Sequence, residues 1–223
     1  DATYRVPILA LPGTGSLTPG LALSYQSGTG DGPLGVGWSV DLGPAVIERS
    51  TRDGPPKFNA TDRFELAVER LIFVPAAAGR PAHYVPQHYD GSRLEWIGSP
   101  VGHWRWLRPD GSRLYFGYHH ASGDNDSRLD SVAVLASAPI SADCAELAVN
   151  CATRRTLVPG GVPFAWHLDR IEDRNGNVVR LTWTAKPGGS NTSDTGYRYL
   201  RGITYSEHVA GVSGIPAFGS GHD

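Results

Sequence analysis

The residues that could carry chemistry are dispersed histidines, acidic side chains, two cysteines and one glycine-rich loop. His119 and His120 are adjacent, so on a strand they would point to opposite faces and one metal ion could not readily use both. No Gly-x-Ser-x-Gly motif marks a nucleophilic serine, and a Ser-His-Asp triad is defined by geometry rather than by spacing. Paired carboxylates for glycoside hydrolysis are likewise a spatial feature. The sequence therefore identifies no catalytic and no cofactor-binding residue.

The glycine loop from Gly28 to Gly37 resembles a phosphate-binding loop only in composition. A phosphate cradle needs a preceding strand, a following helix and usually a lysine with a serine or threonine. Here Pro33 interrupts the loop, no lysine follows nearby, and no helical pattern begins. We therefore interpret the loop as a wide turn in which glycine allows close backbone passage before Trp38 enters a core.

An acidic segment near the middle of the chain offers oxygen ligands of the kind that calcium prefers. Asp124, Asp126 and Asp130 lie close to a glycine in this segment. The spacing fails as an EF-hand, because no glycine stands at the sixth position and no glutamate closes the loop. These three residues are therefore calcium candidates, and a solvated acidic loop is the alternative.

The chain has two cysteines, Cys144 and Cys151, with six residues between them. Two cysteines alone give poor support for a zinc site. A six-residue insert can bring two Cα atoms within bonding range, which favours a local disulfide over two free buried thiols. A disulfide would indicate an oxidising compartment.

Tryptophans are the remaining candidates for a binding surface. Five of them could line a sugar cleft or fill a β core, and the core interpretation is favoured. The Trp-x-Trp pair at Trp104 and Trp106 motivates the sugar alternative, provided that these rings are exposed. The five are Trp96, Trp104, Trp106, Trp166 and Trp183.

Composition limits the class of protein that must position these residues. The 223 residues carry a net charge of −2, with 40% hydrophobic residues, 28 glycines and 17 prolines. This favours a globular domain of short strands and tight turns. No basic stripe suggests nucleic acid, and no apolar run suggests a membrane-spanning helix. The chain starts at Asp1 and has no methionine, which indicates a removed leader or an excised fragment.

Period-two patterns predict strands rather than helices along most of the chain. Pro7 makes the first strand an edge strand, since proline cannot donate to a ladder. Pro109-Asp110-Gly111 and Asn175-Gly176 each mark the turn of a hairpin. The fold class is therefore mainly β: many short antiparallel strands and hairpins in a curved sheet or sandwich-like shell segment, with almost no helix. The expected strands are residues 4–9, 21–26, 46–49, 64–68, 71–74, 94–97, 104–107, 114–118, 164–172, 178–183 and 197–205.

The N-terminal segment resembles the start of the SpvB-like domain, which occurs in the Salmonella plasmid virulence protein B and in B subunits of insecticidal toxin complexes of the Tc/Rhs type. The ordered pattern is P-I, P-G, L-x-P-x-L-x-L-x-Y and G-x-L-G-x-G-W. Similar segments continue through the Trp104 and Asn175 hairpins to residue 205. The structural signature contains Pro7, Pro19, Tyr25, Gly35, Gly37 and Trp38.

This resemblance implies one β domain over residues 1–205 and a Gly/Ser-rich tail over residues 206–223. Residues 136–163, which contain both cysteines, depart from the family pattern. The resemblance implies a non-enzymatic structural domain of a secreted toxin or surface protein. Its partners would be other domains or subunits of a toxin-type assembly that encloses a separate toxic enzyme. Two alternatives remain: a module that binds carbohydrate or a cell surface, and a hydrolase with an unrecognised Asp/Glu/His site.

Overall fold

The computed structural model describes residues 2–15, 17–32, 34–77, 79–98, 102–118, 131–135, 162–184 and 198–209. Its described part is built of strands and connecting turns, without helix. The strands are β1 Thr3–Ile8, β2 Leu21–Gln26, β3 Asp31–Gly32, β4 Gly35–Val36, β5 Trp38–Asp41, β6 Val46–Arg49, β7 Phe64–Leu66, β8 Glu69–Val74, β9 His83–Pro86, β10 Arg93–Ile97, β11 His103–Leu107, β12 Arg113–Phe116, β13 Val132–Leu135, β14 Val162–Glu172, β15 Asn177–Thr184 and β16 Tyr199–His208.

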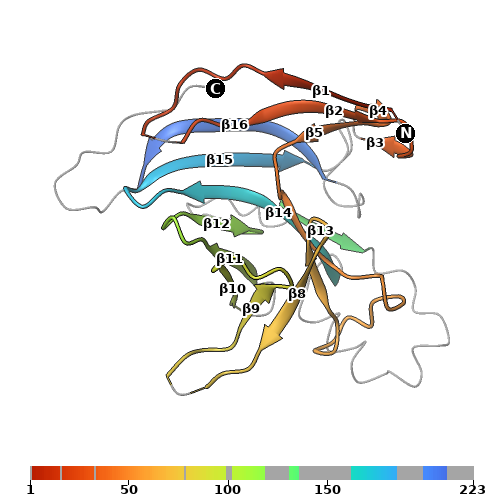
Figure 1. Ribbon diagram of the computed structural model, residues 1–223, viewed down its shortest axis with the longest axis vertical. Coiled ribbons are helices and arrows are strands. Elements are labelled where there is room, and N and C mark those ends of the chain that lie inside the picture. The colour runs from red at the N-terminus through yellow and green to blue at the C-terminus, as the bar shows by residue number, and fades with distance from the viewer. Residues whose placement is uncertain are drawn as a thin grey trace.

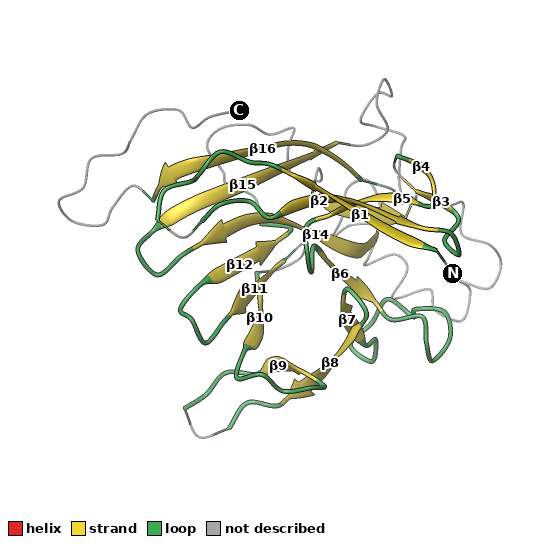
Figure 2. Ribbon diagram, turned by 45° about the horizontal axis from the view of Figure 1, so that its top comes forward, coloured by secondary structure: helices red, strands yellow, loops and turns green. Residues whose placement is uncertain are grey.

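Eight of these strands close into a ring. Strands β6 to β12 pair with their sequence neighbours in antiparallel fashion, and β14 pairs with both β6 and β12. Figure 2 shows the resulting barrel-like ring, with β14 at the join. Strands β15 and β16 extend the sheet beyond the ring, so that the whole curves as one surface (Figure 1). Closure leaves the ring strands without free edges.

Strand β14 can join these parts because it is long enough to have two neighbours on each side. Arg170 pairs with Tyr115 of β12 on one side and with Arg180 of β15 on the other. Nearer the start of β14, Ala165 pairs with Glu48 of β6 on one side and with strand β13 on the other. The turn after β14 follows the expected Asn-Gly chemistry, with Gly176 at φ 84°.

The inside of the ring is filled with aromatic and aliphatic side chains, because alternate residues of each strand face inward. Trp104 lies between Trp96 and Phe116 across neighbouring strands, and Trp166 lies opposite Ile47. The buried cluster contains Ile47, Leu66, Leu71, Leu94, Trp104, Trp106, Leu114, Phe116, Val132, Trp166, Leu168, Val179, Leu181, Trp183 and Tyr205.

The N-terminal segment forms a separate three-stranded sheet in the order β1-β2-β5. Strand β1 is an edge strand, as Pro7 predicted. The segment packs against the main sheet through the loop between β1 and β2, where Gly13 lies close to the Tyr205 ring and Gly15 close to Asn177. Figures 1 and 2 show this small sheet beside β15 and β16.

The mainly β fold class is confirmed, and the expected strands coincide with β1, β2, β6 to β8, β10 to β12 and β14 to β16 within a few residues. Five strands had no prediction: β3 and β4, which lie in the loop interpreted as a wide turn, and β5, β9 and β13. The hairpin at residues 64–74 turns at Ala67, which has a φ of 56°. Glycine is the residue usually found at such a positive φ, because it has no Cβ. Strand β16 continues through His208, so its last three residues lie past residue 205. No described helix is long and apolar enough to cross a bilayer.

Candidate functional site at the mouth of the barrel

One end of the ring carries a connected set of aromatic rings. Trp104 has Phe64, Tyr84 and Trp96 as edge-on neighbours, with ring centroids 4.9, 5.1 and 5.1 Å away. Trp166 contacts Trp96 at 5.4 Å. Edge-to-face pairs of this kind contribute about 0.5–1.5 kcal/mol each beyond burial. The cluster therefore fixes the ring orientations at this end.

Arg49, the last residue of β6, places a guanidinium against this cluster. Its Nη1 donates to Asp62 Oδ2 at 2.7 Å, and its Nε donates to the Pro163 carbonyl at 3.0 Å. The guanidinium carbon also lies 5.2 Å from the Phe64 ring centre and 5.7 Å from that of Trp166. Only 14% of the Arg49 side chain and 5% of the Asp62 side chain are exposed. This is a buried ion pair held by rings on two strands.

Asp62 also shapes the loop between β6 and β7 that borders this end. Its second oxygen accepts a hydrogen bond from the Lys57 backbone N–H at 2.8 Å. Asn59 Oδ1 accepts from the Thr61 backbone N–H at 2.8 Å, which closes a tight turn. The loop includes Phe58 at φ 55°, where it contacts Arg49. One carboxylate therefore ties the loop to the barrel.

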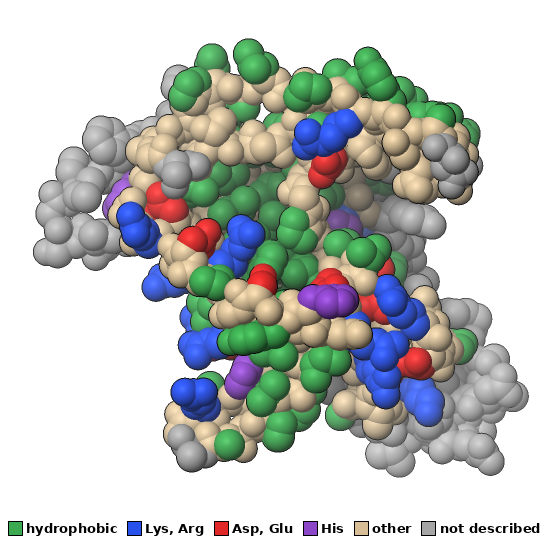
Figure 3. Space-filling view, in the orientation of Figure 1, with side chains coloured by type: hydrophobic (Ala, Val, Ile, Leu, Met, Phe, Trp, Pro, Cys, Tyr) green, Lys and Arg blue, Asp and Glu red, His purple; other side chains and the backbone are tan. Residues whose placement is uncertain are grey.

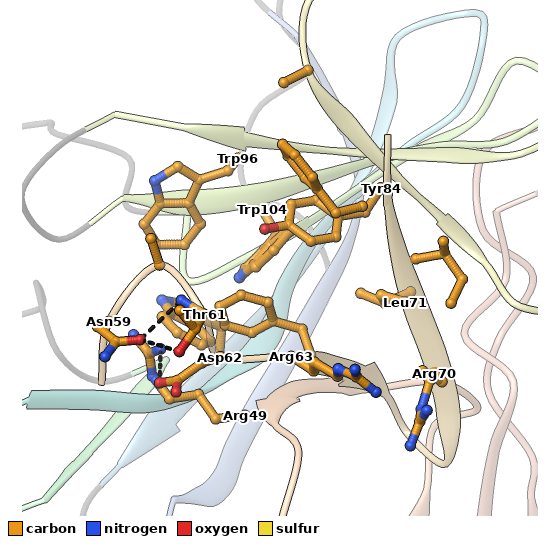
Figure 4. A pocket seen from close by; sticks show the side chains of 16 residues that line it. Arg49, Asn59, Thr61, Asp62, Arg63, Arg70, Leu71, Tyr84, Trp96 and Trp104 are labelled. Atoms are coloured by element: carbon orange, nitrogen blue, oxygen red, sulfur yellow. Dashed lines mark hydrogen bonds and ion pairs between the residues drawn. The ribbon is translucent and has the colours of Figure 1, made fainter. Parts of the chain in front are cut away.

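Between the loop and the rings lies a half-open cavity of about 850 Å³. Figure 4 shows Trp96 and Tyr84, from the neighbouring strands β10 and β9, on one side of it and Asn59, Thr61 and Asp62 on the loop side. Trp96 is 40% exposed, whereas Trp104 is 1% exposed. Burial raises the pKa of the Tyr84 hydroxyl, although the nearby Arg49 opposes the shift. That hydroxyl therefore stays protonated at neutral pH.

The charges around the cavity are already paired. Asp62 binds Arg49, while Arg63 and Arg70 both approach Asp53, at 2.9 and 3.5 Å. Asp62 is the one acidic residue among the described residues that line the cavity. Glycoside hydrolysis by general acid–base catalysis uses two carboxylates, and the described lining of the cavity contains one.

A second polar group lies on the opposite face of the sheet, where cross-strand pairs join strands β10 to β16. Arg105 donates to Glu95 at 2.5 Å, and the Tyr115 hydroxyl donates to Glu172 at 2.9 Å. Arg170 also pairs with Glu172. Arg105 and Glu95 are register partners across β10 and β11, Tyr115 and Glu172 are diagonal neighbours across β12 and β14, and Arg170 and Glu172 are two positions apart on β14; both carboxylates are buried. They are explained as ladder contacts within the sheet.

His167 and Asp169 are two positions apart on β14, where His167 is half-buried and Asp169 is buried. Desolvation lowers the pKa of His167 to about 4, although the ring is only partly buried and lies 4.6 Å from the Trp183 ring. Burial raises the pKa of Asp169 well above its ordinary value, and the neighbouring Ser131 side chain opposes the shift. Both shifts favour uncharged side chains.

The signature residues lie in the N-terminal segment, on its strands and in the loops between them, rather than at the cavity. Pro7 pairs with Ala22, and Tyr25 stacks on Trp38 at 5.2 Å. Gly37 has φ 76°, and a Cβ there would lie 2.6 Å from the Tyr25 ring, so glycine is required. Gly35 has φ 112° and open space around it, and Pro19 lies in the loop before β2. Trp38 is half-buried against Tyr25, outside the main core, which corrects the expectation that it enters a core.

The favoured core interpretation is confirmed for Trp104, Trp106, Trp166 and Trp183, and Trp96 is the exception. Trp104 and Trp106 are 1% and 5% exposed, because both face the inside of the ring. The exposed ring is Trp96; the strand expected at residues 94–97 places it near the end of β10, but no local signal shows that the ring is exposed. The calcium candidates Asp124, Asp126 and Asp130 lie outside the described residues, as do Cys144 and Cys151. Within the described ranges, no three His, Cys, Asp or Glu side chains gather as a metal site.

The fold is that of β domains in known bacterial toxins. The N-terminal domain of effector protein SpvB from Salmonella typhimurium strain LT2 matches with a TM-score of 0.65 and 20% identity, over 94% of this chain and 66% of that chain. The crystal structure of TcdB2-TccC3 matches with a TM-score of 0.61 and 19% identity, over 92% of this chain and 10% of that chain. The Photorhabdus luminescens Tc holotoxin pore matches with a TM-score of 0.63 and 19% identity, over 92% and 9%. At these identities the likeness shows the fold.

Sequence comparison identifies the family. The family model for the Salmonella virulence plasmid 65kDa B protein, SpvB, matches residues 1–128, and the chain belongs to this family. Mono(ADP-ribosyl)transferase SpvB of Salmonella choleraesuis strain SC-B67 is 34% identical over 134 residues, and that of Salmonella typhimurium is 33% identical. The match covers 50% of this chain and 22% of these relatives. The SpvB-like resemblance is thus confirmed.

Proposed function

We propose that this chain is a non-enzymatic structural β domain of a secreted Tc/Rhs-type toxin, in which it forms part of a shell and contacts neighbouring modules. The observation that carries the proposal is the exposed apolar surface of the N-terminal segment: Tyr4 on β1, Leu9 and Leu11 in the loop after it, and Val36 on β4. Leu9 is 100% exposed, and Tyr4, Leu11 and Val36 are each about two-thirds exposed. Figure 3 shows hydrophobic side chains along this side of the molecule.

Exposed apolar side chains along one segment of a chain are typical of a surface that contacts another protein. Strand β1 adds an edge to the sheet. The structural matches to chains of toxin assemblies support other toxin modules as the partner, since the matched chains are about ten times longer than the matched part. The same matches support an exported protein.

Surface labelling tests the assembly role. Hydroxyl-radical footprinting is applied to this chain alone and to the complete product of its gene. We expect Tyr4, Leu9 and Leu11 to be protected in the complete product, with exposed Tyr89 on the far loop as the reference. Equal labelling of the N-terminal sheet in both samples would overturn the assembly role.

A turnover assay tests the non-enzymatic role. The purified chain is incubated with labelled NAD⁺ and a mixture of acceptor proteins, and separately with chromogenic glycoside and ester substrates. We expect no turnover above buffer. Turnover that a single Asp, Glu or His substitution abolishes would show that the domain is an enzyme.

A further inference from the structure

The cavity at the mouth of the barrel has features that a shell does not require. It is half open, it measures about 850 Å³, and a partly exposed tryptophan stands in its wall. Pockets of roughly 300–1,000 Å³ with apolar walls and a few polar groups are the usual sites for small ligands. We propose that this cavity binds a neutral sugar ring, a pyranose, against Trp96.

The charges argue for a neutral ligand. Each arginine at the cavity already faces a carboxylate: Arg49 faces Asp62, and Arg63 and Arg70 face Asp53. An anionic ligand would have to compete with these carboxylates for the same cations. A neutral ligand can use the guanidinium and carboxylate edges as hydrogen-bond partners without separating a pair.

Trp96 supplies the platform for the apolar face of the sugar. The face of an aromatic ring is electron-rich and attracts the partially positive C–H groups of a pyranose. Gly102 holds this indole in place, since a Cβ at residue 102 would lie 2.4 Å from Trp96 Cζ2. The other walls are rings that already pack edge-on to one another.

Hydroxyl partners stand around the platform. The Tyr84 hydroxyl points toward Trp96 and Trp104 in Figure 4 and has no hydrogen-bond partner among the described residues. Asn59, Thr61 and Asp62 face the cavity from the loop side. A phenol, an amide, a hydroxyl and a carboxylate can together donate to and accept from sugar hydroxyls.

Two other ligand types fit less well. An apolar carboxylate would need an unpaired cation at the rim, and each rim arginine has a carboxylate within 3.5 Å. An extended peptide that adds to a sheet would need a free strand edge. The strands that line the cavity, β6 to β11 and β14, each have a paired neighbour on both sides, with β9 and β10 joined at Tyr84 and Leu94.

Saturation-transfer NMR with methyl glucopyranoside, methyl galactopyranoside and methyl mannopyranoside tests the proposal on the whole chain. We expect at least one pyranoside to receive saturation and to shift the Trp96 indole N–H signal at millimolar concentration. Trp96→Ala should weaken Kd about tenfold or more, and Tyr84→Phe by about twofold to tenfold, the value of one hydrogen bond. Tyr89→Ala removes an exposed aromatic ring elsewhere and should leave Kd unchanged.

Tyr84→Phe keeps the ring and the fold, so the test holds even where Trp96→Ala fails to fold. The proposal would be overturned if none of the three pyranosides received saturation. Sugar binding with the same Kd in wild type, Trp96→Ala and Tyr84→Phe would overturn it as well. So would a shift of the Trp96 indole N–H signal by octanoate or by a tryptophan-containing peptide, with no shift by any of the sugars. None of these outcomes bears on turnover or on protection of the N-terminal sheet, so the structural role is tested separately.

Discussion

The mouth of the barrel and the N-terminal sheet contain the same two kinds of contact, but the ion pair is buried in the barrel and more exposed to solvent in the sheet. Each has an arginine–aspartate pair, Arg49–Asp62 in the barrel and Arg5–Asp41 in the sheet. Each also has a glycine against an aromatic ring, Gly102 on Trp96 and Gly37 on Tyr25. The barrel pair is 14% and 5% exposed, whereas the sheet pair is 60% and 35% exposed. Identical chemistry should therefore stabilise the fold in the barrel and contribute little in the sheet.

The largest expected effect comes from Arg49→Met. Removing the guanidinium leaves Asp62 as a buried charge without its partner, which typically costs about 3–5 kcal/mol. It also frees the loop that Asp62 holds at Lys57. We expect the free energy of unfolding, measured by urea denaturation, to fall by that amount. Arg49→Lys keeps the charge but loses the planar contacts with the rings, so its free energy of unfolding should lie between those of wild type and Arg49→Met. A loss below 1 kcal/mol would place the barrel pair in the same class as the sheet pair.

Gly102→Ala is expected to have the next largest effect. The added methyl group would lie 2.4 Å from the Trp96 ring and 2.8 Å from the Gly98 carbonyl oxygen, so the ring or the strand must move. Overpacking of this kind costs about 1–3 kcal/mol. Near-UV circular dichroism should report the changed tryptophan environment.

Gly20→Ala is the matched control, since a Cβ at residue 20 meets nothing within 4 Å. It should be neutral or stabilise the protein by up to about 1 kcal/mol. Equal destabilisation by the two substitutions would contradict the role of Gly102 as the support of Trp96.

Acid should destabilise the fold through His167. Its pKa is about 4 in the folded protein and about 6.5 when unfolded, so the unfolded state binds the proton first as pH falls. Stability is therefore lost from pH 6.5 down to about 4. The full shift corresponds to about 3 kcal/mol, and roughly 1–2 kcal/mol is expected because the ring is partly exposed.

The measurement is the difference in unfolding free energy between pH 7 and pH 4.5 for wild type and His167→Gln. Asp169 acts in the opposite direction, since its raised pKa favours the folded state as pH falls. It is present in both proteins and cancels in the comparison. A pH dependence that is unchanged in His167→Gln would assign the acid sensitivity to other groups.

The difference between the two regions also explains what the sequence could predict. The N-terminal sheet was recognised from local signals: Pro7 at an edge strand, and glycine where φ is positive at Gly37. The barrel mouth depends on contacts between distant residues, such as the 114 positions that separate Arg49 from Pro163. No local pattern predicts that Arg49 meets Trp166, or that Trp96 is the ring left exposed. Hairpin turns fix strand pairs, but closure of the ring through β14 is a long-range event.

The smallest expected effect is that of Arg5→Met. The Arg5–Asp41 pair measures 2.9 Å but is open to solvent, and such pairs contribute about 0–1 kcal/mol. The Asp41 pKa is lowered mainly by the Gly43 backbone N–H and only then by Arg5, so the carboxylate keeps its main partner in the variant. We expect urea denaturation to show no change beyond 1 kcal/mol. Hydrogen exchange should nevertheless accelerate in β1 and β2, because local opening of a small sheet does not require the barrel to unfold. A loss as large as that of Arg49→Met would show instead that the N-terminal sheet and the barrel unfold as one cooperative unit, and that exposure alone does not set the weight of an ion pair in this fold.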